Sequence, residues 1–474
     1  MTDSDNGQKE LHIAPMLDVS LMEFHHLYRI LSKRVTLWTE MVVDETVMYT
    51  NDLDHHMGIS CQSLHPIICQ IGGRSPKYCA EATKAVRRYG YKEVNLNIDC
   101  PSSRVSGKRQ FGAILMAKKH QQACYDVVRA MKDSSECYLK EIETLDEGKS
   151  HDAIITPTIP ISVKTRVGIE TEDGMCCDDL EYLSDFIDNL RKCGCKRFVI
   201  HARKCVIGGL TPAENRLVPP LNYPRFYSLC RRFPDCKFVI NGGIPGLEVA
   251  RKLCYGDEQV NDVDHHSVPC KKCNVLNGSC TAPQTKSNVP QNLVGCMIGR
   301  ACMDNPSMFW DIDRYFYGME KNPCNNRREV LEKYCEYIEK TYPRRCSDSD
   351  ERVTRRFPAP SVHIAKGGCH ICKEFYGHER IYFSTADDIP TIKISSRVVD
   401  RSLKPIQGIF FGLPKSKLFR RECDRLSRNK EVRNCGPGYI IRKALTVMPD
   451  EILDENFTKT EDLIDIPSHV SPQH

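Results

Sequence analysis

The sequence has no long hydrophobic run and no segment typical of protein export. None of its apolar stretches approaches the ~20 residues that a transmembrane helix needs. The N-terminus, MTDSDNGQKE, lacks the apolar core of a secretory signal peptide and the arginines of a transit peptide. We therefore expect a cytosolic protein without membrane association, and an organellar form with a longer N-terminus stays open.

A dinucleotide-binding fingerprint is absent as well. No G-x-G-x-x-G motif follows the first predicted strand, which argues against a Rossmann sheet. Instead, eight short strand-like runs occur, most of them separated by helical patterns: 12–17, 37–43, 66–72, 93–99, 160–167, 196–202, 237–243 and 294–300. Strands that alternate with helices indicate parallel βαβ units, and eight of them predict a closed (β/α)8 TIM barrel of the α/β class.

Two of the intervening helices have clear boundary signals. Ser75 and Pro76 give one of them an N-cap and a proline in its first turn, and Gly90 ends it. The second ends at Gly194, after four apolar residues at helical spacing: Leu180, Leu183, Ile187 and Leu190.

Three polar segments, at about 133–158, 256–292 and 343–400, are longer than the usual connections of a compact domain. We interpret them as surface insertions, partly disordered. The amphipathic segment 327–340 and the ordered-looking segment 401–446 predict a smaller helical domain after the barrel. The expected organisation is a barrel over 1–320, a helical domain over 321–455 and an acidic C-terminal tail over 456–474.

The chain has 26 cysteines scattered through 474 residues. In a large cytosolic chain, reduced thiols are a better interpretation than a disulfide framework. Two C-x-x-C pairs have histidines nearby, so a zinc site built from two insertions is conceivable: Cys270/Cys273 with His265 and His266, and Cys369/Cys372 with His370. Because neither pair has a partner pair at the usual spacing, we expect no metal.

In a TIM barrel the functional groups lie at the carboxyl ends of the strands. Nearly every predicted strand ends in such groups: Met16, Gln70, Asn97 with Cys100, Lys164 with Arg166, His201, Asn241-Gly242-Gly243 and Gly299-Arg300. A single buried His or Gln is usually a satisfied core residue. Groups of this kind at the ends of seven strands predict one shared ligand site.

The last two strands predict a phosphate site, because the loops after strands 7 and 8 commonly bind phosphate in these barrels. The glycines at 242 and 243 allow backbone N–H groups to approach an anion, and Arg300 adds a guanidinium. With Lys164 and His201 on two neighbouring strands, the set fits flavin mononucleotide, since positive charge near N1 and O2 stabilises the reduced ring. Gln70 is placed to hydrogen-bond the ring edge.

Cys100 follows the fourth predicted strand. A thiol with a pKa of ~8.5 is mostly protonated at neutral pH and can donate a proton. A nucleophilic role would need a nearby base and a lowered pKa. No histidine follows Cys100 closely in the sequence, and a spatial neighbour stays open. Pro101 and the polar residues after it argue against a buried, inert thiol.

The net charge of +5 is small but unevenly distributed. From Lys415 to Lys443 there are ten Lys/Arg against three Asp/Glu, an excess of seven that leaves −2 for the rest of the chain. Such a block is either a solvated helical face or a phosphate-binding surface, and charge alone does not decide between them.

Nine sequence motifs together span nearly everything outside the three insertions: APMLDVS, LWTEMV, QIGG, NLNIDCPSSRV…FGAILM, VKTRVGI, IHARKCVIGGLTPAENRLVPPLNYPR, INGGI, MIGRACMDNP and GIFFGLPKSKLFRR. With these motifs the chain resembles the tRNA-dihydrouridine synthase family, nearest its A-type, which acts on D-loop uridines. The long HARK…PPLNYPR block is the most specific of them.

The resemblance implies an FMN-carrying barrel, a helical domain that binds tRNA, and NADPH as the reductant of the flavin. It implies hydride transfer to C6 of an extruded uracil and protonation of C5 by Cys100. The implied flavin contacts are Pro15, Met16, Leu17, Gln70, Lys164, His201, Asn241, Gly242, Gly243, Gly299 and Arg300. The implied tRNA contacts are Asn97, Arg216, Lys417 and Arg420, and Arg203 is placed to extend the same basic track.

Three positions depart from the family pattern. Ala213 stands where bacterial members carry a tRNA-facing lysine, and Lys417 where they carry an arginine. Both changes bear on the choice of uridine more than on the reaction. NIDCPS differs from the commoner NVGCPS next to the cysteine, and Asp99 there is expected either to raise the pKa of the Cys100 thiol or to point to solvent.

Two alternative functions stay open. A flavin barrel oxidoreductase for a small molecule such as dihydroorotate would have no use for KSKLFRR or a helical domain. A catalytically silent tRNA-binding or folding factor would lose nothing when Cys100 becomes Ala. A monomer is the simplest expectation for the oligomeric state.

Overall fold

The computed structural model describes residues 8–57, 64–107, 109–136, 158–256, 289–342 and 396–457. It divides into two compact units. The first contains the described residues up to His25 and those of Arg34–Met303, and the second contains His26–Lys33 and the described residues from Asp304 onward. The second unit begins before the expected boundary at about 320, because residues such as Asp313 pack within it: Ser32 Oγ and Lys33 N both donate to the Asp313 carboxylate.

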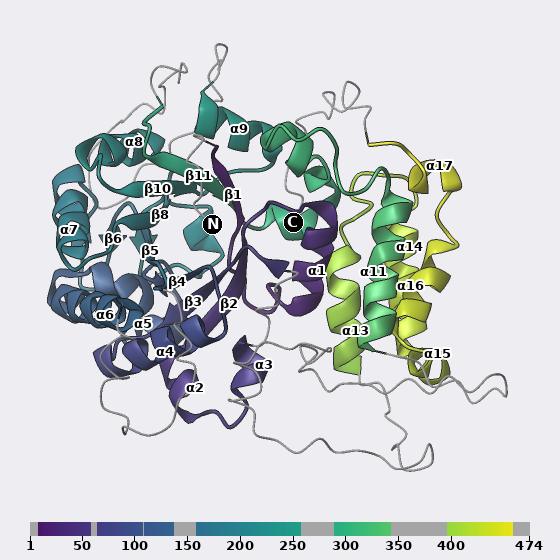
Figure 1. Ribbon diagram of the computed structural model, residues 1–474, viewed down its shortest axis with the longest axis horizontal. Coiled ribbons are helices and arrows are strands. Elements are labelled where there is room, and N and C mark those ends of the chain that lie inside the picture. The colour runs from purple at the N-terminus through teal and green to yellow at the C-terminus, as the bar shows by residue number, and fades with distance from the viewer. Residues whose placement is uncertain are drawn as a thin grey trace, which may run out of the picture. The chain divides into compact units, whose positions relative to one another are not determined.

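The first unit is built on eight parallel strands: β1 (Glu10–Ile13), β2 (Leu37–Val43), β3 (Ile67–Gly72), β4 (Glu93–Asn97), β5 (Ile161–Arg166), β8 (Arg197–His201), β10 (Lys237–Asn241) and β11 (Leu293–Ile298). Their order is β1-β11-β10-β8-β5-β4-β3-β2. The two end strands meet where Ile13 N donates to Thr36 O and Thr36 N donates to Leu11 O, both at 2.9 Å. The ring therefore closes, and the predicted TIM barrel is confirmed (Figure 1).

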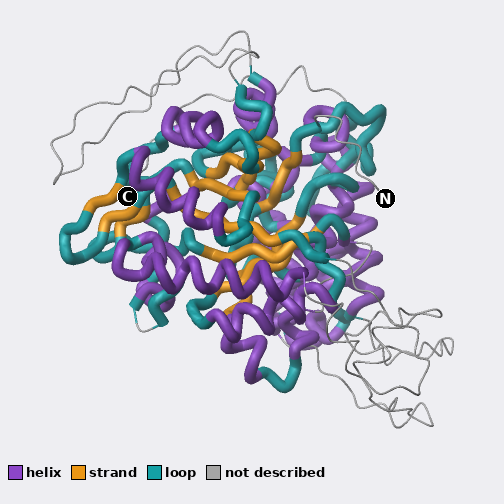
Figure 2. Tube along the Cα trace, turned by 60° about the vertical axis from the view of Figure 1, so that its left-hand side comes forward, coloured by secondary structure: helices purple, strands orange, loops and turns teal. Residues whose placement is uncertain are grey.

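Helices lie outside the ring of strands in both views (Figures 1 and 2). Those up to the end of the barrel are α1 (Met22–Leu31), α2 (Asp44–Tyr49), α3 (Leu53–Met57), α4 (Pro76–Arg88), α5 (Ser103–Ser106), α6 (Lys118–Glu136), α7 (Leu180–Lys192), α8 (Tyr223–Arg232), α9 (Leu247–Tyr255) and α10 (Ala301–Asp304). The predicted cap of α4 is present, since Ser75 Oγ accepts from Tyr78 N. Gly90 and Gly194, after α4 and α7, adopt positive φ as expected of helix-ending glycines.

Two features of the barrel differ from the sequence prediction. β1 ends at Ile13 instead of 17, because Pro15 has no N–H to donate to a ladder. A small sheet of β6 (Ile169–Glu170), β7 (Cys176–Cys177) and β9 (Cys205–Val206) was not predicted. Its one sequence signal is the Asp-Gly pair between β6 and β7, which is typical of a hairpin turn.

The second unit is helical after the barrel: α11 (Arg327–Thr341), α13 (Ser396–Leu403), α14 (Ser416–Arg428), α15 (Lys430–Asn434), α16 (Pro437–Leu445) and α17 (Asp450–Leu453). α11 confirms the helix predicted at 327–340. α6 runs to Glu136 and α13 starts at Ser396, so two expected insertions are shorter at these ends than predicted. Most of the remainder of the three insertions, both C-x-x-C pairs and nearly all of the acidic tail lie outside the described residues.

Within the described ranges, no helix is long and apolar enough to cross a bilayer. No disulfide joins the cysteines of this part of the chain, which agrees with the interpretation of reduced thiols. The same ranges contain no group of three or more His, Cys, Asp or Glu side chains arranged to hold a metal ion.

Candidate active site

Four neighbouring strands, β4, β5, β8 and β10, place polar side chains together at their carboxyl ends. In the strand register Asn97 lies opposite Lys164, and His201 lies between Arg166 on one side and Asn241 on the other. All five residues are buried. The parallel pairing therefore assembles residues that are up to 144 positions apart in the sequence, from 97 to 241.

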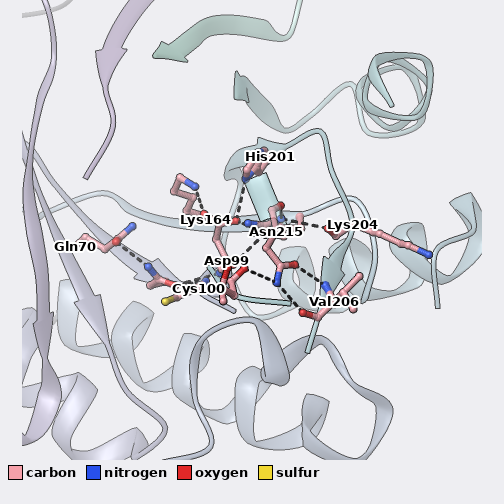
Figure 3. Close-up of polar contacts among 11 residues, drawn as sticks. Gln70, Asp99, Cys100, Lys164, His201, Lys204, Val206 and Asn215 are labelled. Atoms are coloured by element: carbon pink, nitrogen blue, oxygen red, sulfur yellow. Dashed lines mark hydrogen bonds and ion pairs between the residues drawn. The ribbon is translucent and has the colours of Figure 1, made fainter. Parts of the chain in front are cut away.

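Asp99 lies at the centre of this group. Its carboxylate accepts hydrogen bonds from Lys164 Nζ, from Arg166 Nε at 2.7 Å and from His201 Nδ1 at 3.3 Å. Figure 3 shows Asp99 beside Cys100, with Lys164 and His201 directed toward it. Of the two expectations for this residue, pointing to solvent is wrong, because the carboxylate turns inward to the cations of β5.

The charges of this group follow from burial and from its ion pairs. Burial alone would raise the pKa of the Asp99 carboxyl, but Lys164 and Arg166 hold that pKa well below its usual range. Burial lowers the pKa of His201 to about 3, and Arg166 contributes to this shift. Near pH 7 the imidazole is therefore neutral. The positive charge that we expected from Lys164 and His201 comes from Lys164 and Arg166 instead.

The backbone of Cys100 is fixed from two sides. Its N–H donates to Asn97 Oδ1 at 3.0 Å, and its carbonyl accepts from Ala113 N at 3.0 Å. Gly112 has a φ of +73°, and a Cβ there would lie 2.8 Å from the Cys100 carbonyl oxygen. This close approach and the positive φ explain why glycine stands at position 112.

The Cys100 thiol is half-buried, so it is still reachable by a ligand. Burial raises the pKa of this thiol, and the negative charge of Asp99 adds to the rise. The predicted effect of Asp99 on the thiol thus has the expected direction. A thiol that stays protonated at neutral pH is suited to donate a proton rather than to act as a nucleophile.

Gln70 and Asn97 are held by a chain of buried amides. Asn97 Nδ2 donates to Gln70 Oε1 at 2.8 Å, and Gln70 Nε2 donates to Asn95 Oδ1 at 2.9 Å. Asn95 Nδ2 continues the chain to Ser162 Oγ at 2.8 Å. These hydrogen bonds fix the orientation of the Gln70 side chain, and they also fix Asn97, which accepts from the backbone N–H of Cys100.

The predicted phosphate side is formed by three glycines and Arg300. Gly242 and Gly243 adopt φ of +105° and +68°, backbone conformations that favour glycine. A Cβ at Gly299 would meet only Ala14 Cβ, at 3.8 Å. Arg300 is exposed, and its guanidinium makes no ion pair with any described residue. Backbone N–H groups beside a guanidinium form a donor set that fits a phosphate.

The remaining predicted flavin contacts follow β1. Pro15 and Met16 are half-buried, whereas Leu17 is 70% exposed. Met16 N donates to Ser20 Oγ at 3.0 Å, which fixes the start of this loop. The structure places the segment at the same end of the barrel as Gly299 and Arg300, because β1 pairs with β11.

Two predicted tRNA contacts lie in the loop after β8. Arg203 Nη1 donates to the carbonyls of Leu217, at 3.3 Å, and Pro219, so it supports the loop. Arg216 is half-buried, and its Nε has no hydrogen-bond partner in the described part of the chain. Burial lowers the pKa of Arg216, and Arg300 and Arg166 lower it further. An unsatisfied guanidinium near other cations suits an electron-rich ligand.

The other two predicted tRNA contacts, Lys417 and Arg420, belong to the second unit. Both are exposed on α14, whose buried side is formed by Phe419, Cys423 and Leu426. Neither makes an ion pair with any residue that the structure describes. The two cations are therefore accessible to a ligand.

Arg166 was expected beside Lys164 at the end of its strand but without a flavin or tRNA role, although it is central to the site. Only 2% exposed, it bonds Asp99 and donates through Nη1 to Lys204 O at 3.1 Å and Asn215 O at 2.9 Å. Asn215 in turn clamps Val206 through two hydrogen bonds of 2.8 Å (Figure 3). The available signal was the spacing of two from Lys164, which puts both side chains on one face of β5.

Comparison with known proteins identifies the family of the chain. Residues 12–256 match the family model described as dihydrouridine synthase (Dus). The tRNA-dihydrouridine(20/20a) synthase of Vibrio cholerae is 33% identical over 334 residues, which cover 70% of this chain and 80% of the relative. The protein of the same name from Escherichia coli strain K12 is 32% identical over 329 residues, covering 69% and 75%.

Among solved structures, morphinone reductase has a TM-score of 0.39 at 10% identity, over 68% of this chain and 88% of that one, a similarity too low to support an inference. The family match spans more than half of the chain and includes Gln70, Cys100, Lys164 and His201. This chain belongs to the dihydrouridine synthase family, and within it to the A-type.

Proposed function

We propose that this protein reduces the C5=C6 bond of specific D-loop uridines in tRNA to dihydrouridine, with FMN as its flavin and NADPH as the reductant. The names of its relatives support tRNA uridine as the substrate. The observation that carries the proposal is a half-buried, protonated thiol, Cys100, beside two buried cations at the mouth of a TIM barrel.

The reaction needs a hydride on one side of the base and a proton on the other. The uracil C5=C6 bond is conjugated to the C4 carbonyl, so a bound flavin would supply a hydride to C6, and negative charge would then develop toward C5. Cys100 then protonates C5, and its thiolate recovers a proton from solvent. The raised pKa of this thiol keeps the proton in place until the base is present.

The residues that would hold the flavin fall into two groups. Lys164 and Arg166 supply positive charge for the electron-rich part of the ring, and Gln70 supplies an oriented amide. Gly242, Gly243, Gly299 and Arg300 would hold the phosphate. Pro15, Met16, Leu17, His201 and Asn241 complete the predicted set.

A uridine inside folded tRNA must leave its stack before Cys100 can reach it, at a cost of a few kcal/mol. Contacts between phosphates and the exposed cations of α14, Lys417 and Arg420, offset such a cost. Asn97, Arg203 and Arg216 are the tRNA-facing residues proposed on the barrel. The partnerless Nε of Arg216 is the observation that best supports this role.

The test is Cys100→Ala. We expect a yellow, flavin-loaded protein that binds tRNA normally and forms dihydrouridine at least ~100-fold more slowly, the usual contribution of a general acid. Cys176→Ala is the matched control, because Cys176 is an exposed cysteine of the same unit outside the site. The activity of this variant should equal that of the parent protein. Unchanged turnover of Cys100→Ala would remove this residue from the mechanism.

The same experiment separates the alternatives. A silent tRNA-binding factor would form no dihydrouridine in either variant. An oxidoreductase for free pyrimidines would turn over without tRNA. Mapping dihydrouridine by mass spectrometry in tRNA from cells that lack this protein identifies the uridines that it modifies.

A further inference from the structure

Asp99 is in contact with three buried basic side chains of the site. Its Oδ1 accepts from Arg166 Nε at 2.7 Å, and its Oδ2 contacts Lys164 Nζ. The side chains of Lys164 and Arg166 are 5% and 2% exposed, so water does little to screen these charges. A third neighbour, His201, donates to the same carboxylate from Nδ1 at 3.3 Å.

The carboxylate halves the positive charge of the group. Lys164 and Arg166 carry +2, Asp99 carries −1 and neutral His201 carries none, which gives +2 − 1 = +1. With an uncharged residue at position 99, the same cations would present +2 to a ligand. The residue next to Cys100 therefore sets the net charge of this group.

We infer that Asp99 is a positioning residue that tunes the flavin: by offsetting one of two buried cations, it lowers the reduction potential of the bound flavin and makes the reduced flavin a stronger hydride donor. Positive charge beside a flavin stabilises its reduced form, so removing part of that charge has the opposite effect. The inference rests on the proposed function, since it requires a flavin beside Lys164.

The test is the midpoint potential of the bound flavin, measured by reductive titration with reference dyes. Asp99→Asn and Asp99→Gly should raise the potential by at least about 30 mV, which is tenfold in the stability of the reduced relative to the oxidised form for two electrons. Asp99→Glu keeps the negative charge, so its midpoint potential should stay closer to that of the parent protein. A residue that only supports the fold would change stability but not this potential.

Asp235→Asn is the matched control. Asp235 also joins an arginine and a lysine, with distances of 3.1 Å to Arg191 Nη1 and 3.4 Å to Lys196 Nζ, but it lies in the loop before β10, at the amino ends of the strands. The same substitution there should leave the potential unchanged.

The outcomes are distinguishable. A parent protein that binds no flavin would contradict the proposed function, and this inference with it. A flavin-loaded parent whose potential is the same in Asp99→Asn and Asp99→Gly would overturn only the tuning role. If both variants fail to fold while Asp99→Glu folds, Asp99 is required for the fold and the tuning role is wrong as well.

Discussion

The carboxyl end of β4 and the segment after it contain three residues with different structural roles: Asn97, Asp99 and Cys100. The Asn97 amide accepts hydrogen bonds from the backbone of Asp99, at 3.1 Å, and of Cys100, at 3.0 Å. Asp99 turns toward Lys164 and Arg166, and the cysteine is left half-buried at the barrel mouth. The geometry of the thiol is thus set locally, whereas its charge environment is set by β5.

The first prediction concerns the Cys100 thiol. Asp99→Asn removes a negative charge next to it and leaves Lys164 and Arg166 unpaired, and both changes favour the thiolate. The pH midpoint for alkylation of Cys100 should therefore move to lower pH, measured by mass spectrometry of its peptide. Cys176, followed in the same samples, should keep its midpoint. An unchanged or higher midpoint at Cys100 would contradict the assigned electrostatics.

The second prediction concerns His201. Its folded pKa of about 3 lies below the unfolded value of 6.5, so the unfolded chain binds the additional proton between these values. The stability due to neutral His201 is complete above pH 6.5 and is lost as the pH falls, by at most ~1.4 kcal/mol per pH unit. His201→Gln should flatten the fall in free energy of unfolding between pH 6.5 and 4.5, measured with urea.

The chosen window separates His201 from Asp99. The pKa of Asp99 is depressed, so its contribution is present above the unfolded value of ~3.9 and is lost only at lower pH. Buried His12 also has a lowered pKa, but it contributes equally to parent and variant. Identical slopes for the two proteins would show that His201 is charged in the folded state.

At the scale of elements, the strands could be predicted from the sequence, and the loops that follow them could be predicted in part. β2 and β3 are mostly apolar, and their observed bounds agree with the prediction to within one residue. The glycines after β10 were predicted as phosphate contacts. The structure adds a packing reason, because a Cβ at Gly242 would lie 2.5 Å from His201 Cδ2.

The third prediction follows from this contact. Gly242→Ala should cost about 1–3 kcal/mol of stability through backbone strain at φ +105° and should also reduce flavin occupancy by displacing His201. Gly209→Ala is the matched control, since Gly209 has a φ of +83° but no atom within 4 Å of a Cβ there. Urea unfolding and flavin absorbance measure the two effects. Equal flavin occupancy in both variants would argue against a role of the loop after β10 in flavin binding.

At the scale of the whole molecule, charge is separated between the parts of the chain. The excess of seven positive charges at 415–443 exceeds the total net charge of +5. These residues form α14, α15 and α16, and the exposed cations lie mainly on α14. This separation favours an anionic macromolecule as ligand of the second unit. The cytosolic location and the monomeric state stay predictions.

The fourth prediction tests this surface. Arg420→Glu should weaken tRNA binding on the order of tenfold at low salt and reduce the slope of log affinity against log salt by about one or more, because a phosphate contact is lost. The flavin should be retained. Lys340→Glu, the same charge reversal at an exposed position of α11, is the control. Equal losses in both variants would place the tRNA surface elsewhere.

The sequence by itself determined the barrel and predicted most of the side chains that the structure brings together at the strand ends. Apolar runs with helical patterns between them specify β/α units, and parallel pairing then brings the strand ends together whatever lies in the insertions. The motifs around Cys100 and HARK carried the family, which the comparisons confirmed.

Only the tertiary structure decided how the charged groups are paired. Asp99, Lys164, Arg166 and His201 meet across three strands, and burial then sets which of them are ionised. Neither partner choice nor burial can be read from a single stretch of sequence, because both depend on strand register and on the loops packed above. That is why the neutral state of His201, the inward turn of Asp99 and the ion pair of Arg166 with Asp99 were missed.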